Sequence, residues 1–279
     1  MAKHEGLVQR RALSQVFLRA EWPGLKVAER LNSWHVRRVL EVGPGGGILT
    51  KTLLANKFKV TAVEKDRRFA EKLRDQVHGD ETGQLQVVEQ DFLQFDLASW
   101  FAASGEPSAI VGNIPYSISS PILVKILPHI ASVKGAIFLV QLEFGQRLVA
   151  NPNSKAYGSL SVFTQLRAKP EMECRVDRGC FSPVPRVDSA LVSFRAKASP
   201  LSNTLLSKVE TVTRSAFNQR RKILRNAIKP YLTDDLDASS PFDLNRRPET
   251  LWPEEFVLLT KHLFPDWEKD EGAPKTSSP

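Results

Sequence analysis

The sequence predicts an α/β domain built on a parallel, Rossmann-like sheet, followed by a small all-helical domain. Between residues 37 and 140, short β-rich apolar runs alternate with segments of helical periodicity, the pattern of parallel strands connected by helices. Beyond residue 200 no strand pattern is convincing, and the apolar residues follow helical spacing instead. The chain therefore divides into two parts of different secondary structure.

The α/β domain is expected to cover residues 1–197, including a basic N-terminal segment. Its expected strands are 38–42, 59–64, 85–89, 109–112 and 136–140. The expected helices between them are 48–56, 67–77 and 121–130. Two later strands, 172–177 and 189–195, flank a Pro-rich turn, so we expect them to form an antiparallel ribbon at one edge of the sheet.

The helical domain is expected to cover residues 201–267, after a linker at 198–200. Its expected helices are 203–217, 220–231 and 253–263, the last with Pro253 in its first turn. Residues 268–279 are polar and rich in Pro and Ser, and we expect them to form a disordered tail.

Composition excludes several classes of protein. The two cysteines cannot form a disulfide framework, and the five histidines are scattered, so no metal site is expected. The N-terminus has no hydrophobic signal region, and no stretch is long and apolar enough to span a membrane. A cytoplasmic protein without a membrane partner is expected.

The charge balance indicates an anionic partner. The net charge is +8 and the isoelectric point is near 9.5. Residues 214–229 contain six basic side chains and no acidic one. Taken alone, such a run is equally typical of a solvated helix face.

A glycine-rich turn follows the first expected strand. Gly43, Gly45 and Gly47 permit a sharp turn and a close approach of a ligand to bare main chain. This pattern by itself indicates only a nucleotide-like cofactor. The G-x-G-x-G spacing departs from the dinucleotide fingerprint G-x-G-x-x-G, which disfavours a dinucleotide without excluding it.

Acidic residues end the next two expected strands. Glu64 lies 21 residues after Gly43, where a carboxylate can accept both ribose hydroxyls of an adenosine, and Asp91 is placed to accept from the adenine amine. Each acid alone could be a solvated loop residue. Together with the glycine turn, they predict a cofactor that contains adenosine but no pyrophosphate, which fits S-adenosylmethionine.

The tetrapeptide Asn113-Ile114-Pro115-Tyr116 ends the fourth expected strand. It resembles the (N/D)-(P/L/I)-P-(Y/F) motif of methyltransferases that act on exocyclic amines of bases. An Asn side-chain oxygen and a neighbouring carbonyl can accept the two N–H groups of an adenine amine and direct its lone pair toward a methyl group. Pro115 stiffens the turn, and Tyr116 offers a stacking face to an unpaired base. In isolation the tetrapeptide could be a strand-ending turn with a half-buried tyrosine.

Several separated segments together resemble the small-subunit rRNA adenine dimethyltransferases. The matching segments are 10–18, 41–50, 113–121, 151–162, 181–192 and 216–226. The last three distinguish this family from the methylases of large-subunit rRNA. The resemblance implies a class I S-adenosylmethionine-dependent methyltransferase fold. It also implies dimethylation of N6 of two adjacent adenines in the hairpin near the 3′ end of small-subunit rRNA, during ribosome biogenesis.

The resemblance also implies roles for individual residues. The cofactor-binding residues would be Val16, Leu18, Gly43, Gly45, Glu64, Asp91 and Asn113. Asn113, Pro115 and Tyr116 would be catalytic. Tyr116 would stack on the target base, and Phe181 would cover its other face unless it is a core aromatic ahead of the Pro-rich turn.

Two positions depart from the family pattern. Ser14 and Val16 replace Gly and Asn in the family's G-Q-N-F-L segment. The Val16 side chain cannot form a hydrogen bond, so its contact with the cofactor is lost or is made by the main chain only. Ser117 replaces the Asn that usually follows the tyrosine, a change expected to matter less.

The basic run acquires a role in this interpretation. On a helix, Arg214, Arg221 and Arg225 would lie near one face and bind phosphates, with Lys222 beside them. Arg10 and Arg11 would extend this surface. RNA duplexes are bound mainly through backbone and shape, which suits a broad basic surface. The implied partner is small-subunit rRNA within the immature 30S subunit, and nothing demands more than a monomer.

Three alternatives stay open on the sequence. One is an adenine methylase of large-subunit rRNA. Another is a mainly nonenzymatic factor of small-subunit assembly, which the loss of the Asn at Val16 favours. The third is a dinucleotide-dependent oxidoreductase, which would have no use for Tyr116.

Overall fold

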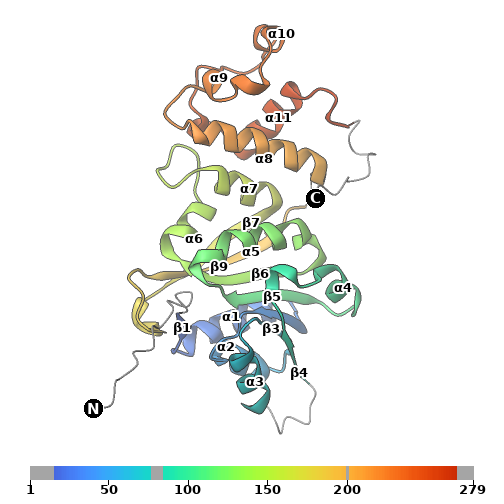
Figure 1. Ribbon diagram of the computed structural model, residues 1–279, viewed down its shortest axis with the longest axis vertical. Coiled ribbons are helices and arrows are strands. Elements are labelled where there is room, and N and C mark those ends of the chain that lie inside the picture. Colours follow the sequence, from blue (N-terminus) through green and yellow to red (C-terminus); the bar gives the residue numbers. More distant parts are fainter. Residues whose placement is uncertain (1–15, 77–83, 199–200, 269–279) are drawn as a thin grey trace, which may run out of the picture. The chain divides into compact units, whose positions relative to one another are not determined.

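A computed structural model describes residues 16–76, 84–198 and 201–268 of the chain (Figure 1). The chain forms two compact units. Unit 1 comprises Met1–Ile126, Ser132–Leu142 and Glu173–Val192. Unit 2 comprises Leu127–Ala131, Glu143–Met172 and Ser193–Pro279.

A seven-stranded sheet has the order β4-β3-β2-β5-β6-β9-β7, and β1 pairs with β8 in a separate two-stranded sheet. The strands are β1 Phe17–Leu18, β2 Arg38–Val42, β3 Lys59–Glu64, β4 Leu85–Glu89, β5 Ser108–Asn113, β6 Gly135–Gln141, β7 Ala168–Val176, β8 Phe181–Ser182 and β9 Ser189–Ala196. The pairs β4-β3, β3-β2, β2-β5 and β5-β6 are parallel. The carboxyl ends of β2, β3 and β5 therefore lie at one edge of the sheet.

Helices cover both faces of this sheet in unit 1. They are α1 Trp22–Ser33, α2 Ile48–Ala55, α3 Arg67–Gln76, α4 Leu97–Ala102 and α5 Ser119–Ile126. Alternate strand residues such as Val39 and Val111 share one apolar core with α1, α2 and α3. Leu40 and Ile110, which point to the opposite face, are also fully buried, and Figure 1 shows α4 and α5 on that side. Burial on both faces explains why these strands are continuous apolar runs.

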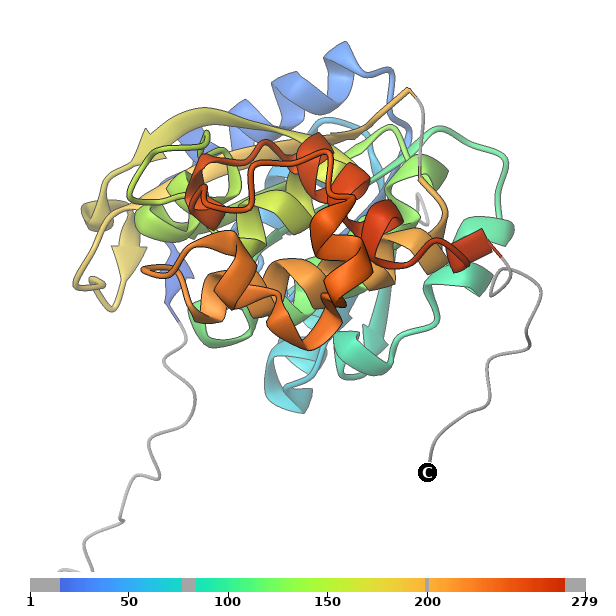
Figure 2. The same ribbon diagram turned by 90° about the horizontal axis from the view of Figure 1, so that it is seen from above.

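Unit 2 is built mainly of helices around a second apolar core. Its helices are α6 Leu142–Leu148 (whose first residue belongs to unit 1), α7 Ser159–Arg167, α8 Asn203–Asn218, α9 Leu224–Ala227, α10 Asp234–Ala238 and α11 Pro253–Leu263. Helices α8 and α11 lie side by side in Figures 1 and 2, and their apolar residues pack in one core cluster with Tyr157. The Tyr157 hydroxyl donates to the Leu251 carbonyl at 2.8 Å.

The predicted α/β organisation is confirmed in its main elements. The strands at 38–42, 59–64 and 85–89 have the expected bounds, and the predicted edge ribbon corresponds to the neighbouring strands β9 and β7. The division into compact units differs from the expected boundary at residue 197, because α7 packs with α8 and α11. A methyltransferase domain at 1–197 and an RNA-binding domain at 201–267 stay predictions.

The expected helix over 220–231 is wrong. Only Leu224–Ala227 are α-helical, followed by a 3-10 turn at Lys229–Tyr231. The amides of Leu224 and Arg225 donate to the carbonyls of Arg246 and Leu244. Since these first amides find their acceptors in a distant segment, the helix begins at Leu224. Arg221 and Lys222 lie in the turn before it.

No helix within the described ranges combines the length and apolarity needed to cross a membrane. The expected disordered tail lies outside the described residues, apart from its first residue, Glu268.

Candidate functional site

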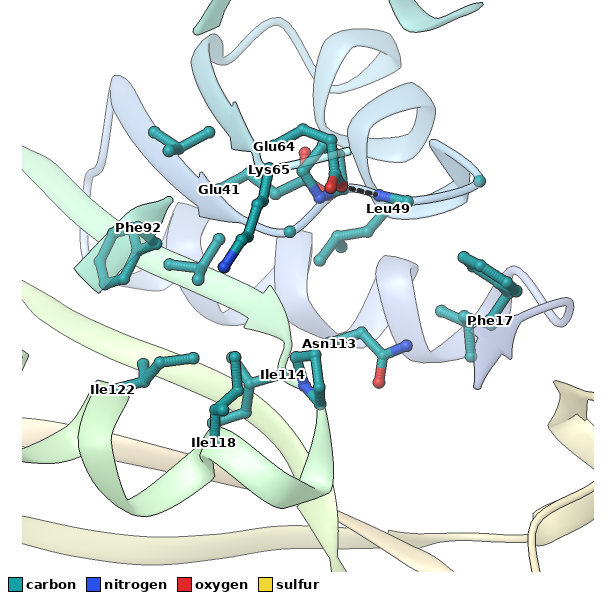
Figure 3. A pocket seen from close by; sticks show the side chains of 18 of the residues that line it. Phe17, Glu41, Leu49, Glu64, Lys65, Phe92, Asn113, Ile114, Ile118 and Ile122 are labelled. Atoms are coloured by element: carbon teal, nitrogen blue, oxygen red, sulfur yellow. Dashed lines mark hydrogen bonds between the residues drawn. The ribbon is translucent and has the colours of Figure 1, made fainter. Parts of the chain in front are cut away.

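A cavity of about 240 Å³ opens in unit 1 at the carboxyl ends of β2, β3 and β5 (Figure 3). Nine predicted site residues line it: Val16, Leu18, Gly43, Gly45, Glu64, Asp91, Asn113, Pro115 and Tyr116. The parallel topology brings the other seven together, because neighbouring strands deliver their last residues to the same edge, whereas Val16 and Leu18 come from the segment at β1.

The glycine turn forms the floor of the cavity between β2 and α2. Gly43, Gly45 and Gly47 all have positive φ angles. At Gly45 (φ +51°) an added Cβ would also lie 2.9 Å from the Phe17 ring, so no side chain fits there. An added Cβ at Gly43 or Gly46 would meet no atom within 4 Å. The turn therefore presents bare main chain to open space.

Glu64 ends β3 and is 95 % shielded from solvent, with a relative exposure of 5 %. Its Oε2 accepts from the Gly45 amide at 3.0 Å, and its Oε1 accepts from the Asp66 amide at 2.9 Å. The bond from Gly45, the dashed line in Figure 3, fixes the carboxylate against the glycine turn, and the bond from Asp66 holds its other oxygen. Each oxygen retains a further lone pair for a ligand hydroxyl.

Asp91 follows β4 and begins a 3-10 turn, Phe92–Gln94. Its Oδ1 accepts from the Leu93 amide at 2.9 Å, and its Oδ2 accepts from Lys65 Nζ at 2.7 Å. The Lys65 hydrogen bond is the main cause of the lowered pKa of Asp91. A ligand amine that binds this carboxylate must therefore share it with Lys65.

Glu41, one residue before the end of β2, lines the cavity but was not among the predicted site residues. It is 1 % exposed, and its Oε2 has no hydrogen-bond partner among the described residues. Burial, assisted by the negative charge of Glu64, raises the pKa of Glu41 to about 8. The carboxyl is therefore mostly protonated at neutral pH in the folded chain.

Replacing Glu41 with glutamine should change how stability depends on pH. The wild-type carboxyl is ionised in the unfolded chain above about pH 4.5 but stays protonated in the folded chain up to about pH 8. Wild-type stability relative to Glu41→Gln should therefore fall as pH rises through this window, by at most about 1.4 kcal/mol per pH unit. Urea unfolding of both proteins at pH 5 and pH 7.5 measures this, and a difference independent of pH would contradict it.

Asn113 ends β5, and its side chain is oriented by the N-terminal segment. The Asn113 Nδ2 donates to the main-chain carbonyl of Val16 at 2.9 Å. Because the amide nitrogen is engaged, the oxygen is left to accept from a ligand in the cavity. The main chain at Val16 thus orients a residue of the site, while the contact of Val16 with the cofactor stays a prediction.

Tyr116 begins the 3-10 turn Tyr116–Ile118 and is partly buried at the cavity wall. Its hydroxyl forms a hydrogen bond of 2.9 Å with Ser189 Oγ, at the start of β9. Burial raises the pKa of Tyr116, so the phenol is protonated at neutral pH. The hydroxyl fixes one end of the ring while the ring itself lines the cavity.

Phe181 does not match the predicted stacking role. Its side chain has a relative exposure of 0 %, belongs to the core of unit 1 and does not line the cavity. A residue that stacks on a base needs an open ring face. Phe181 is therefore a core aromatic in this structure, as the alternative interpretation of the sequence expected.

The basic run of unit 2 is largely engaged within the protein. Arg214 pairs with Glu210, and Arg225 forms a close ion pair with Asp237. Arg220 pairs with Glu249 at 2.6 Å and also donates to two main-chain carbonyls. Arg225 is therefore engaged by Asp237 in this structure, and its predicted contact with phosphate stays a prediction.

Arg221, Lys222 and Lys229 are the exceptions in this run. All three are exposed, and none has an ion-pair partner among the described residues. Arg10, Arg11 and Ser14 lie outside the described residues. Within the described ranges no group of His, Cys, Asp or Glu could hold a metal ion.

Sequence reasoning missed several residues that line or support the cavity. Phe17, Lys65 and Ile118 line it, and Ser189 holds Tyr116. Phe17 and Lys65 directly follow Val16 and Glu64, so their position beside predicted site residues was the available signal. Nothing local distinguishes Ser189 from other strand serines.

Comparisons with known proteins agree with this geometry. Residues 7–247 match the family described as "Ribosomal RNA adenine dimethylase". A "Ribosomal RNA small subunit methyltransferase A" of Chlorobium phaeobacteroides is 38% identical over 263 residues, covering 94% of this chain and 97% of the relative. The protein of that name from Leptothrix cholodnii is 36% identical and covers 91% of each chain.

Two solved structures share most of the fold. A dimethyladenosine transferase from Plasmodium falciparum has a TM-score of 0.71 and 25% sequence identity, covering 91% of this chain and 98% of that one. The 23S rRNA methyltransferase ErmE has a TM-score of 0.66 and 28% identity, covering 88% of this chain and 99% of that one.

Proposed function

Because the chain belongs to the ribosomal RNA adenine dimethylase family, and is an S-adenosylmethionine-dependent rRNA adenine dimethyltransferase, we propose that it dimethylates N6 of two adjacent adenines in the hairpin near the 3′ end of small-subunit rRNA. The substrate would be presented within the immature 30S subunit, in the cytoplasm, and the enzyme would act as a monomer. The oxidoreductase alternative is wrong, since the whole matched region belongs to a methylating family.

The choice of the small subunit rests on the relatives. Those of 34–38% identity over more than nine-tenths of the chain are named as small-subunit methyltransferases. The structural likeness to the 23S rRNA methyltransferase ErmE, at 28% identity, makes large-subunit rRNA a second candidate substrate. An experiment must distinguish it from small-subunit rRNA.

The cavity fits the cofactor on observations of this structure. Open space faces Gly43 and Gly46, where a side chain would intrude, and the Glu64 carboxylate is held with lone pairs to spare. Glu64 would accept from ribose hydroxyls, Asp91 from the adenine amine, and Val16 and Leu18 would complete the wall. When bound, S-adenosylmethionine supplies the electrophilic methyl group of its sulfonium.

The orientation of Asn113 is the observation that carries the proposed chemistry. Because the Asn113 Nδ2 donates to the Val16 carbonyl, the Asn113 oxygen is left to accept one N–H of the target amine, and the Ile114 carbonyl would accept the other. Both acceptors favour a pyramidal nitrogen with its lone pair aimed at the methyl group. Pro115 stiffens this turn, and Tyr116 stacks on the unpaired base. No strong base is needed, because the amine becomes acidic once methylated.

Analysis of modified nucleosides tests the proposal directly. The purified protein is incubated with a labelled methyl donor and either undermethylated small subunits or large subunits. We expect N6,N6-dimethyladenosine at two adjacent positions near the 3′ end of small-subunit rRNA. Label confined to the large subunit would establish the second candidate. Absence of label despite binding to small subunits would favour a nonenzymatic assembly factor.

Replacing Tyr116 with alanine should impair catalysis far more than cofactor binding. Loss of base stacking costs about 1–3 kcal/mol, or roughly 5- to 150-fold in kcat/KM. Tyr116→Phe is the matched control, since it removes only the hydrogen bond to Ser189 and should retain most activity. Steady-state methylation and calorimetry with S-adenosylhomocysteine measure the two effects. Full activity of Tyr116→Ala would exclude stacking by this ring.

Neutralising Arg221 and Lys222 should flatten the salt dependence of RNA binding. Each lost phosphate contact reduces the slope of log K against log salt by about 0.7–0.9. Arg225→Ala is the control, because its guanidinium already pairs with Asp237 and should leave the slope nearly unchanged. Filter binding at several salt concentrations gives the slopes. An unaltered slope in the Arg221/Lys222 variant would identify this turn as a solvated surface.

A further inference from the structure

An exposed loop joins β8 to β9 beside the cavity. Residues 182–187, named here the Pro-Val loop, read Ser-Pro-Val-Pro-Arg-Val. Val184 is 61 % exposed and Val187 is 45 % exposed, two of the few large apolar side chains that unit 1 leaves in solvent. Pro183 and Pro185 restrict the backbone on either side of Val184, so the loop presents its apolar side chain on a stiff support.

Both ends of the Pro-Val loop are attached to residues that line the cavity. At one end, Ser182 in β8 is the antiparallel partner of Phe17 in β1, which lines the cavity wall. At the other end, Ser189 forms a hydrogen bond with the Tyr116 hydroxyl at 2.9 Å. The loop therefore lies next to the ring that is proposed to receive the target base.

Asp188 fixes the base of the loop. Arg175 Nε donates to its Oδ2 at 2.9 Å, the Arg178 amide donates to its Oδ1 at 3.0 Å, and its carbonyl accepts from the Leu142 amide. The Arg175 contact is the main cause of the lowered pKa of Asp188, which is therefore ionised at neutral pH. Because these hydrogen bonds hold the base of the loop, the loop does not depend on packing of its two valines against the protein. The valine side chains therefore stay available to a ligand.

Given the proposed function, we propose that the Pro-Val loop is a wedge that inserts between the target adenine and its stacked neighbour in the rRNA hairpin. Apolar side chains and prolines are the groups that proteins insert between base steps to unstack them. Val184 and Val187 would replace the stacking contact that the neighbour loses when the adenine turns toward Tyr116. Arg186 is exposed, has no ion-pair partner among the described residues, and would bind the adjacent phosphate.

Fluorescence of a base analogue tests the wedge. The hairpin carries 2-aminopurine in place of the stacked neighbour of the first target adenine, because base stacking quenches this analogue and contact with an aliphatic side chain does not. Titration with wild-type protein and S-adenosylhomocysteine should raise the emission severalfold. At saturating protein, the double variant Val184→Ser/Val187→Ser should lose more than half of this rise while its affinity for S-adenosylhomocysteine stays within twofold of wild type.

Two further variants separate wedging from general damage. Val184→Ile/Val187→Ile keeps apolar side chains on the loop and should retain the rise. Val124→Ser makes the same replacement at a site on α5 that is 42 % exposed and does not line the cavity, and it should also retain the rise.

The outcomes distinguish the wedge from the proposed function. A full rise in the serine double variant would overturn the wedge, as would an isoleucine variant that loses the rise or wild-type protein that binds the hairpin without any rise. None of these results affects the assignment of the substrate, which nucleoside analysis decides separately. If the small-subunit adenines are not methylated at all, the proposed function fails first.

Discussion

Replacing Asn113 with alanine is expected to lower kcat by about 10²- to 10³-fold, the usual cost of removing one preorganised polar group from a reacting centre. The side chain of Asn113 supplies the acceptor that holds the target amine, and its Nδ2 is tied to the Val16 carbonyl. Affinity for S-adenosylhomocysteine should change less than tenfold, because most of the cavity wall remains. Single-turnover methylation and calorimetry measure the two quantities.

Asn113→Asp is the informative partner of this variant. A carboxylate keeps the acceptor oxygens but cannot donate to the Val16 carbonyl, so it should retain intermediate activity. The order wild type, Asn113→Asp, Asn113→Ala in kcat would support both the acceptor and its orientation by Val16. Activity of Asn113→Ala within fivefold of wild type would remove this residue from the reacting centre.

Replacing Glu64 with alanine is expected to weaken cofactor binding by roughly 1.5–3 kcal/mol, or about 10- to 100-fold in Kd. The carboxylate is buried and held by the amides of Gly45 and Asp66, so it is ready to accept from ribose without rearrangement. Calorimetry with S-adenosylhomocysteine measures the loss.

A ligand lacking one hydroxyl separates the direct contact from damage to the glycine turn. For wild type, the 2′-deoxy form of S-adenosylhomocysteine should bind more weakly than the parent compound. For Glu64→Ala, the two ligands should bind almost equally, because the partner of that hydroxyl is gone. If the variant discriminates between them as strongly as wild type does, Glu64 acts only through the position of the glycine turn.

Local patterns predicted the strands and most of the cavity. The apolar runs at 38–42, 59–64 and 85–89 could only be buried strands, and the ends of parallel strands meet at one edge. Glu64, Asp91 and Asn113 could therefore be placed together from their positions after these runs. The longest amphipathic helices, at Asn203–Asn218 and Pro253–Leu263, were predicted for the same reason.

Predictions failed where distant contacts overrode local preference. The run at 220–231 has helical spacing, but the carbonyls of Leu244 and Arg246 take the amides that would have extended the helix backward. Arg225, which the sequence predicted to bind RNA, forms an ion pair with Asp237 that no local pattern indicated. Phe181 was predicted to cover a face of the target base because it precedes an exposed turn. The pairing of β1 with β8 places its side chain in the core instead.

The sequence by itself determined the chemical groups of this protein: a glycine turn, carboxylates after two strands, an amide and a phenol after another, and an excess of positive charge. Only the tertiary structure decided their state. It engages the Asn113 amide nitrogen with a carbonyl 97 residues away, keeps Glu41 protonated by burial, and sets the Pro-Val loop beside Tyr116 through Ser189. Orientation, protonation and access depend on through-space contacts, which local sequence patterns do not encode.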